Sequence, residues 1–155
     1  MIIFHSNRTI VEYPVIKRGK CGKDFYFGFY CVKSEDQCRK RAIFYNEKRY
    51  LNKYEYIPDD TLKYKVFNAR TEEWLDFVVA CRQGNSHRYD IVEGPMADDI
   101  IIQYYMDNKI SRAEFWESIK YQEVIDQISF HTVSALDTLN FIGSESITGI
   151  KEISP

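Results

Sequence analysis

The sequence lacks the features of several common classes of protein. It contains only 7 glycines and 4 prolines among 155 residues, and it has no repeat and no low-complexity tract, so we expect one continuous fold. No run approaches the ~20 apolar residues that a membrane span requires, and in the opening MIIFHSNRTI the apolar stretch before His5 is too short for the hydrophobic region of a signal peptide. We therefore expect a cytoplasmic protein with no membrane partner, although a secreted effector exported by a dedicated machine would look the same.

Motifs for metal, phosphate and nucleophile chemistry are also missing. The four cysteines form no C-x-x-C, which argues against a zinc knuckle or a redox centre, and we expect reduced thiols. There is no GxxxxGK[ST], HExxH or GxSxG. The histidines lie on separate segments. A hydrolase or metal site built from them is a further hypothesis, which bound zinc would support. The residues concerned are Cys21, Cys31, Cys38 and Cys81, and His5, His87 and His131.

Positive charge is in slight deficit. The chain carries 21 Lys and Arg against 23 Asp and Glu, a net charge of −2. Affinity for nucleic acid comes mainly from neutralising phosphates with clustered basic residues, so generic nucleic-acid binding is not expected. Two local basic runs, at 17–23 and 39–41, predict either solvated surfaces or contacts with an anionic ligand or target.

What is present is a globular composition rich in aromatic residues. Hydrophobic residues make up 45% of the chain, which has 12 Tyr and 10 Phe. A chain of this length buries roughly 68–70% of the surface that its unfolded form exposes. We therefore expect a single domain spanning residues 1–155.

The clearest helices are marked by their N-terminal caps. Ser34 and Ser111 are each followed three residues later by Gln or Glu, the spacing of a capping box. Thr71 precedes a run in which apolar residues recur at i, i+3, i+4 and i+7 before Gly84. Helices are thus predicted to begin after these caps, with a further helix over 97–109 and a short one over 134–139.

Short strands alternate with these helices without a strict βαβ rhythm. They are indicated by alternation of period two and by their aromatic and β-branched content. The predicted strands are MIIFH (1–5), FYFGFYCV (25–32), KYEYI (53–57), YKVFN (64–68), YDIVEGP (89–95), QISFHT (127–132) and NFIGSESI (140–147). Because G-x-G-x-x-G is absent too, this mixture predicts an α+β fold rather than a doubly wound one.

A glycine and several polar residues interrupt these strands. A glycine inside a strand marks a bulge or a close approach to the backbone, so Gly28 indicates room for a ligand. His5 ends the first predicted strand, and period two places Gln127, Ser129 and His131 on one face of a late strand. Taken singly, each of these residues is more often structural than functional.

Longer segments of the chain resemble one bacterial family. Beyond His5 and the GFY segment before a capped helix, they are WLDFVVACRQG (74–84), YDIVEGPMADD (89–99) and DQISFHT (126–132). They occur in the order found in the family catalogued as domain of unknown function 3990, within the ADP-ribosyltransferase clan. The resemblance covers residues 3–144, almost the whole chain.

The resemblance implies a fold, a substrate and a set of residues. The clan forms two small antiparallel sheets, flanked by helices, with NAD bound in the cleft between them through a His-Tyr-Glu signature. If this signature is transferred to the present sequence, His5 would hydrogen-bond the adenosine ribose, Tyr30 would stack on the nicotinamide, and Gln127 would take the third place. NAD would be the substrate, with no metal. These three are the implied catalytic residues, and the implied NAD-binding set is His5, Ser6, Gly28, Phe29, Tyr30 and Gln127.

The sequence departs from the family at three positions. Ser6 and Tyr26 stand where the family has glycine, and Gln127 stands where the clan commonly has Glu. Cleavage of the ribose–nicotinamide bond develops positive charge on the sugar. A carboxylate ~4 Å away, at an effective dielectric of ~20, would attract that charge by roughly 4 kcal/mol, or about three powers of ten in rate. Gln127 lacks the charge, so we expect slow, target-dependent transfer and weak hydrolysis of free NAD.

We therefore expect an enzyme, an ADP-ribosyltransferase that transfers ADP-ribose from NAD to a macromolecule, with a protein as the expected acceptor. By analogy with compact bacterial members of the clan, it would be a toxin or effector restrained by a small antitoxin or immunity partner. The alternative is a catalytically degenerate member that acts as a nucleotide-binding or protein-interaction module. Gln127, Ser6 and Tyr26 are the features that favour the alternative.

Overall fold

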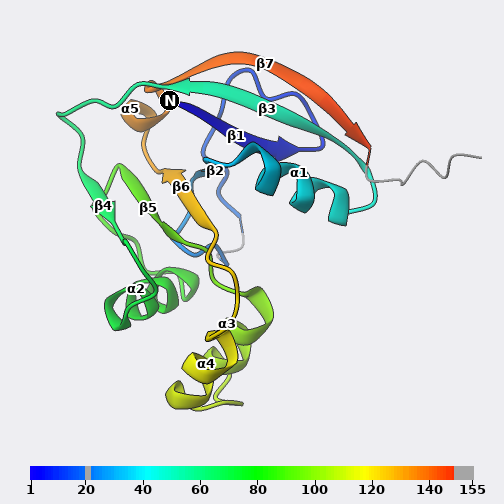
Figure 1. Cartoon of the computed structure of the whole chain (residues 1–155). Coiled ribbons are helices and arrows are strands. Elements are labelled where there is room, and N and C mark those ends of the chain that lie inside the picture. Colours follow the sequence, from blue (N-terminus) through cyan, green and yellow to red (C-terminus); the bar gives the residue numbers. More distant parts are fainter. Residues whose placement is uncertain (20–21, 149–155) are drawn as a thin grey trace, which may run out of the picture.

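The computed structural model is a mixed α+β fold in which helices flank one sheet (Figure 1). It describes residues 1–19 and 22–148, so Cys21 lies outside the described residues, whereas Cys31, Cys38 and Cys81 are buried. The described strands are β1 (Ile2–Asn7), β2 (Phe29–Val32), β3 (Lys48–Tyr56), β4 (Tyr64–Val66), β5 (Ile91–Pro95), β6 (Asp126–Phe130) and β7 (Leu139–Thr148). The described helices are α1 (Glu35–Phe44), α2 (Glu72–Arg82), α3 (Asp99–Met106), α4 (Arg112–Ile119) and α5 (Val133–Leu136).

The sheet has seven strands in the order β4-β5-β6-β2-β1-β3-β7, and only β4 and β5 are parallel. β1 pairs with β3 from Ile2 to Asn7 but with β2 at one position, Phe4 opposite Val32. This narrow junction joins the strands into one sheet, where the resemblance implied two. The ladder between β1 and β2 does not continue toward Asn7 and Phe29, so the two strands part next to the junction.

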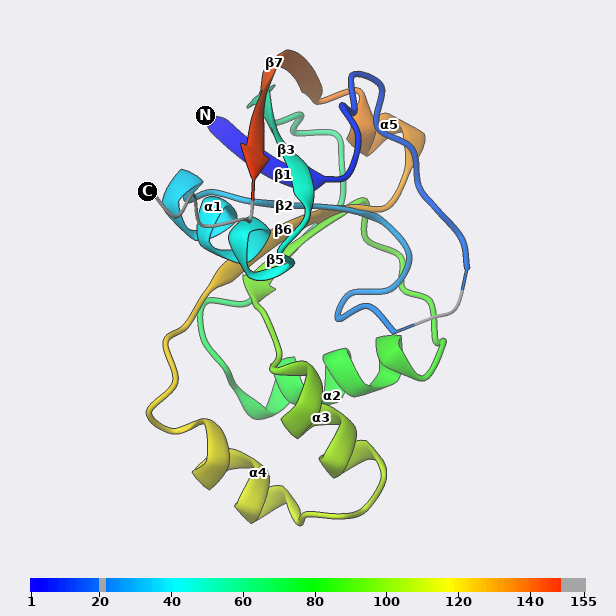
Figure 2. The ribbon, with the colours of Figure 1, turned by 90° about the vertical axis from the view of Figure 1, so that its right-hand side faces the viewer.

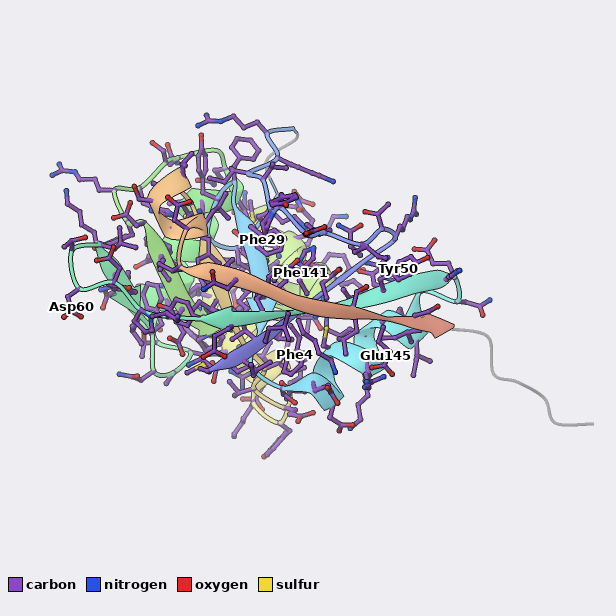
Figure 3. The ribbon with its side chains drawn as sticks, turned by 90° about the horizontal axis from the view of Figure 1, so that it is seen from above. Phe4, Phe29, Tyr50, Asp60, Phe141 and Glu145 are labelled. Atoms are coloured by element: carbon purple, nitrogen blue, oxygen red, sulfur yellow. The ribbon has the colours of Figure 1, made fainter. Side chains whose placement is uncertain are left out.

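The two faces of the sheet are covered differently (Figure 2). One face packs on α5 around a core that includes Phe29. The other face carries α1 at one end, packed on Phe4, and the helices α2 to α4 at the other end, packed around Trp74. Figure 3 shows Phe29 and Phe141 on one side of the β7 ribbon and Phe4 on the other. On this second face, the central strands are therefore flanked by α1 at one end of the sheet and by α2 to α4 at the other.

The three predicted caps are confirmed. The side chains of Ser34, Thr71 and Ser111 accept hydrogen bonds from backbone N–H groups three residues on, and Ser111 forms a full capping box with Glu114. Each cap satisfies a donor that a helix start would otherwise leave unpaired. Gly84, with a φ of 96°, follows α2 as expected. The helices are short, and none within the described residues could cross a bilayer.

The strand boundaries differ from prediction around the candidate site. β2 begins at Phe29, four residues later than predicted, because Tyr26 has a φ of 77° and residues 24–28 form a turn. A bulky residue rarely adopts this left-handed conformation. β1 continues to Asn7, so His5 lies inside the strand and does not end it.

Gly28 is required by the neighbouring strand. A Cβ atom at this position would lie 2.8 Å from both His131 Nδ1 and Phe130 O. The space expected for a dinucleotide is therefore occupied, on this side of Gly28, by the His131 ring. The absence of a side chain lets the 24–28 turn lie against β6.

Gly28→Ala is expected to lower the free energy of unfolding by about 1–3 kcal/mol, because the added methyl group must displace His131 or the backbone of Phe130. Gly143→Ala is the matched control, since a Cβ at Gly143 meets nothing within 4 Å. Its effect should stay within about 0.5 kcal/mol. Urea denaturation of both variants measures the difference, and equal stability of the two would contradict the proposed crowding at Gly28.

Candidate functional site

A cavity of about 580 Å³ opens on the face of the sheet that carries α1 to α4, in the space between α1 and the α2–α3 pair. The strands contribute Val32 and Gln127, and the helices contribute Arg41, Arg82 and Gln103. The volume lies within the roughly 300–1,000 Å³ of small-molecule sites. The division of the helices into two groups thus creates room for a ligand above the central strands.

A second cavity of about 510 Å³ lies between the start of β2 and the segment 9–17. It shares His5, Lys23 and Tyr30 with the larger cavity. The two cavities therefore adjoin at the place where β1 and β2 part. Together they can accept an elongated ligand.

The structure brings the predicted site residues around these two cavities. β2 pairs with β6 so that Tyr30 lies opposite Ser129 and Val32 opposite Gln127, which places residues distant in sequence on one face. The roles of the predicted residues toward NAD stay predictions. The larger cavity is lined by His5, Ser6, Tyr30 and Gln127, and the smaller by His5, Gly28, Phe29 and Tyr30.

His5 bridges the opening between β1 and β2. Its Nδ1 atom lies 2.6 Å from the carbonyl oxygen of Tyr30, so Nδ1 carries the proton and donates. Its ring packs on Phe29, with centroids 4.2 Å apart. Burial is the main reason that the pKa of His5 falls from 6.5 to about 4; nearby Arg49 also lowers it, whereas the bond to Tyr30 opposes the shift. The ring is thus neutral at physiological pH, with Nε2 as an acceptor.

Tyr30 is anchored through its hydroxyl group. Its Oη atom accepts a hydrogen bond from Phe25 N and donates one to Tyr26 O, at 3.0 and 2.5 Å. The ring stacks on Phe25 and meets His131 edge-on. These contacts orient the ring at the border of both cavities.

Gln127 contacts a buried carboxylate that sequence reasoning missed. Its Nε2 atom donates to Asp24 Oδ2 at 2.8 Å. The same carboxylate accepts from Arg82 Nε and Nη2 and from the backbone N of Ala97, while Arg82 also pairs with Asp99. Asp24 is only 6% exposed. The sequence carried no signal that joins Asp24 to Arg82, which lies 58 residues away.

Besides Tyr30, side chains from two other parts of the chain hold the turn that carries Asp24. His87 donates to Phe25 O at 2.8 Å, and His131 donates to Phe27 O at 2.7 Å. His131 Nε2 in turn accepts from the hydroxyl of Ser129. These bonds engage the histidines in structure, and no three His, Cys, Asp or Glu residues within 1–19 and 22–148 are grouped as metal ligands.

Positive charge exceeds negative charge around the larger cavity. Cationic side chains converge here from the residue before the 24–28 turn and from α1, β3 and α2, against two carboxylates that both pair with Arg82. Such a surplus favours an anionic ligand, because a cavity with low-dielectric walls concentrates the field of its charges. The cations are Lys23, Arg41, Arg49 and Arg82, and the carboxylates are Asp24 and Asp99.

Residues 1–141 match the model of a family described as protein of unknown function (DUF3990). The chain belongs to this family. The family is the one that the sequence resemblance named, so that prediction is confirmed. No curated protein and no solved structure matches the chain.

The buried histidines make stability depend on pH. The pKa of His131, like that of His5, is lowered to about 4, chiefly by burial and also by His87, although the bond to Phe27 O opposes the shift. Unfolded histidine titrates near 6.5. Between these values the unfolded chain binds more protons than the folded one, so acidification favours unfolding.

We therefore expect the free energy of unfolding to fall as the pH is lowered from 7 to 5, by up to about 2 kcal/mol for each of the two histidines. Urea denaturation across this range measures the dependence. A His5→Gln variant keeps an N–H donor for Tyr30 O but does not titrate, so its dependence on pH should be shallower. Stability that rises on acidification would contradict the lowered pKa values.

Proposed function

We propose that the protein is an NAD-dependent ADP-ribosyltransferase that transfers ADP-ribose to a protein target. The observation that carries the proposal is the convergence of His5, Tyr30 and Gln127 on two adjoining cavities, where β1 and β2 part. NAD is long and anionic. Two joined cavities with a surplus of positive charge suit such a ligand, and the ADP-ribosyltransferase-like fold is part of the same proposal.

Each residue is suited to a separate part of NAD. The neutral His5 ring offers Nε2 as an acceptor for a ribose hydroxyl, because Nδ1 is engaged by Tyr30 O; the hydroxyl would replace the long 3.4 Å contact from Asn7 Nδ2. The aromatic ring of Tyr30, held through its hydroxyl group, provides a stacking surface for nicotinamide. Lys23 and Arg41 line the larger cavity and would contact the pyrophosphate.

The reaction needs little proton transfer at the leaving group. The bond between the ribose C1′ and the nicotinamide nitrogen breaks, and its electron pair stays on the nitrogen, so the cationic ring departs as neutral nicotinamide. A lone pair of the acceptor bonds to C1′, and the acceptor then loses its proton to water. The amide oxygen of Gln127 faces the developing positive charge with a dipole but no net charge, so transfer is slow and depends on positioning.

The degenerate module remains the second candidate, because Gln127, Ser6 and Tyr26 differ from the residues that the resemblance implies at these positions. Incubation with labelled NAD and a bacterial lysate separates the two candidates. A transferase labels one or a few proteins, whereas a module labels none. Action as a toxin or effector under the control of a small partner is a further part of the first proposal, and it rests on the clan resemblance alone.

Tyr30→Ala is expected to weaken NAD binding and labelling about 10- to 100-fold, because loss of one aromatic stacking surface costs about 1–3 kcal/mol. Tyr121→Ala is the matched control, since Tyr121 is 89% exposed and lies outside both cavities. Calorimetry measures binding, and circular dichroism checks that both variants fold. If a folded Tyr30→Ala protein binds NAD like the control, the stacking role is wrong.

A further inference from the structure

The Asp24 carboxylate is surrounded by nitrogen donors. Arg82 Nε and Nη2 donate to Oδ1 at 2.8 and 2.5 Å, whereas Ala97 N and Gln127 Nε2 donate to Oδ2 at 2.9 and 2.8 Å. Four N–H groups therefore donate to the two oxygens, and none of these groups could accept a hydrogen bond from a protonated carboxyl. The group is a buried carboxylate whose oxygens are bonded inside the protein.

We propose that Asp24 is the positioning residue for Gln127: it holds the side-chain amide so that Oε1 faces the larger cavity. The inference rests on the proposed function, because it gives that oxygen its place beside the ribose. An ionised carboxylate only accepts hydrogen bonds. The end of the Gln127 amide that meets Asp24 is therefore Nε2, and the other end, Oε1, makes no hydrogen bond among the described residues.

The same contact explains why residue 127 is an amide. A glutamate here would place a second carboxylate against Asp24, at the 2.8 Å now spanned by an N–H···O bond. Two carboxylates that share a site cannot both be ionised readily, so one retains a proton. Arg82 is already shared between Asp24 and Asp99 and cannot neutralise a third carboxylate. Residues 24 and 127 are therefore matched to each other.

The orientation matters for the chemistry at the sugar. With Oε1 toward the cavity, the negative end of the amide dipole points at the positive charge that develops on the ribose. If the amide turned over, its N–H groups would point at the ribose, and their partial positive charge would destabilise the positive charge that develops on the sugar. A ribose hydroxyl can bond to either end, so reversal should affect kcat more than KM.

The test compares the wild type with Asp24→Asn, Gln127→Glu and the double variant. In Asp24→Asn the new Nδ2 group meets Gln127, the amide turns over, and kcat should fall about tenfold while KM changes less than about twofold. In the double variant, the new amide at position 24 donates to the new carboxylate at position 127, and kcat should recover to the wild-type value or above. Asp24→Asn and the double variant both lose the bond from Ala97 N, so the difference between them reports on position 127.

A second readout requires no NAD. In Gln127→Glu, NMR titration of the new carboxyl should show a pKa well above the usual value of about 4.3 for Glu, and this shift should disappear in the double variant. Asp76→Asn is the matched control, because it removes a carboxylate partner of another arginine, Arg112, at a 68% exposed side chain outside both cavities. It should leave kcat unchanged.

The outcomes separate the two proposals. If the wild type binds no NAD, the proposed function fails, while the NMR titration still decides whether Asp24 and residue 127 are coupled. An unshifted pKa in Gln127→Glu, or a double variant no better than Asp24→Asn, would overturn the positioning role. Should Asp24→Asn fail to fold, the titration of Gln127→Glu decides alone.

Discussion

The Asp24 carboxylate is the interaction on which the arrangement of the site depends. A buried charge is costly unless it is paired and hydrogen-bonded, and Asp24 meets this requirement with donors from α2, from the segment before α3 and from β6. The guanidinium of Arg82 is the ionic partner, and its pKa is raised, because attraction to Asp24 and Asp99 outweighs the burial that would lower it. The carboxylate therefore links the α2–α3 group to the sheet at one wall of the larger cavity.

The turn that carries Asp24 is held by hydrogen bonds to the backbone carbonyl oxygens of the turn. Side chains from the α2–β5 loop, from β2 and from the end of β6 each bind one of three successive carbonyl oxygens. The turn contains a left-handed Tyr26 and a glycine pressed against His131. Tyr30 is one of the side chains that hold the turn, and it also lines both cavities. A change that loosens the turn would therefore also change the shape of the candidate site.

The opening between β1 and β2 has a local cause that links fold and function. The ladder is limited to the pair of Phe4 and Val32, and the His5 ring binds the Tyr30 carbonyl beyond it. A histidine in this position completes the backbone hydrogen bonding and keeps its second nitrogen, Nε2, as an acceptor, which Asn7 Nδ2 approaches at 3.4 Å. The two adjoining cavities at this opening and the resemblance to the ADP-ribosyltransferase clan are the two grounds on which a nucleotide function is proposed.

The sequence alone was enough to predict the starts of three helices and the candidate residues of the site. Ser34, Thr71 and Ser111 indicated their helices, because capping is a contact between residues three apart, and the order of the family segments brought His5, Tyr30 and Gln127 forward as candidates. The length of β2 could not be predicted, since the conformation of Tyr26 depends on side chains far along the chain. The union of the strands into one sheet, the contact of His131 with Gly28, and the pairing of Asp24 with Arg82 and Gln127 were decided by the tertiary structure. Each joins residues that only folding brings together, and burial then makes their hydrogen bonds obligatory.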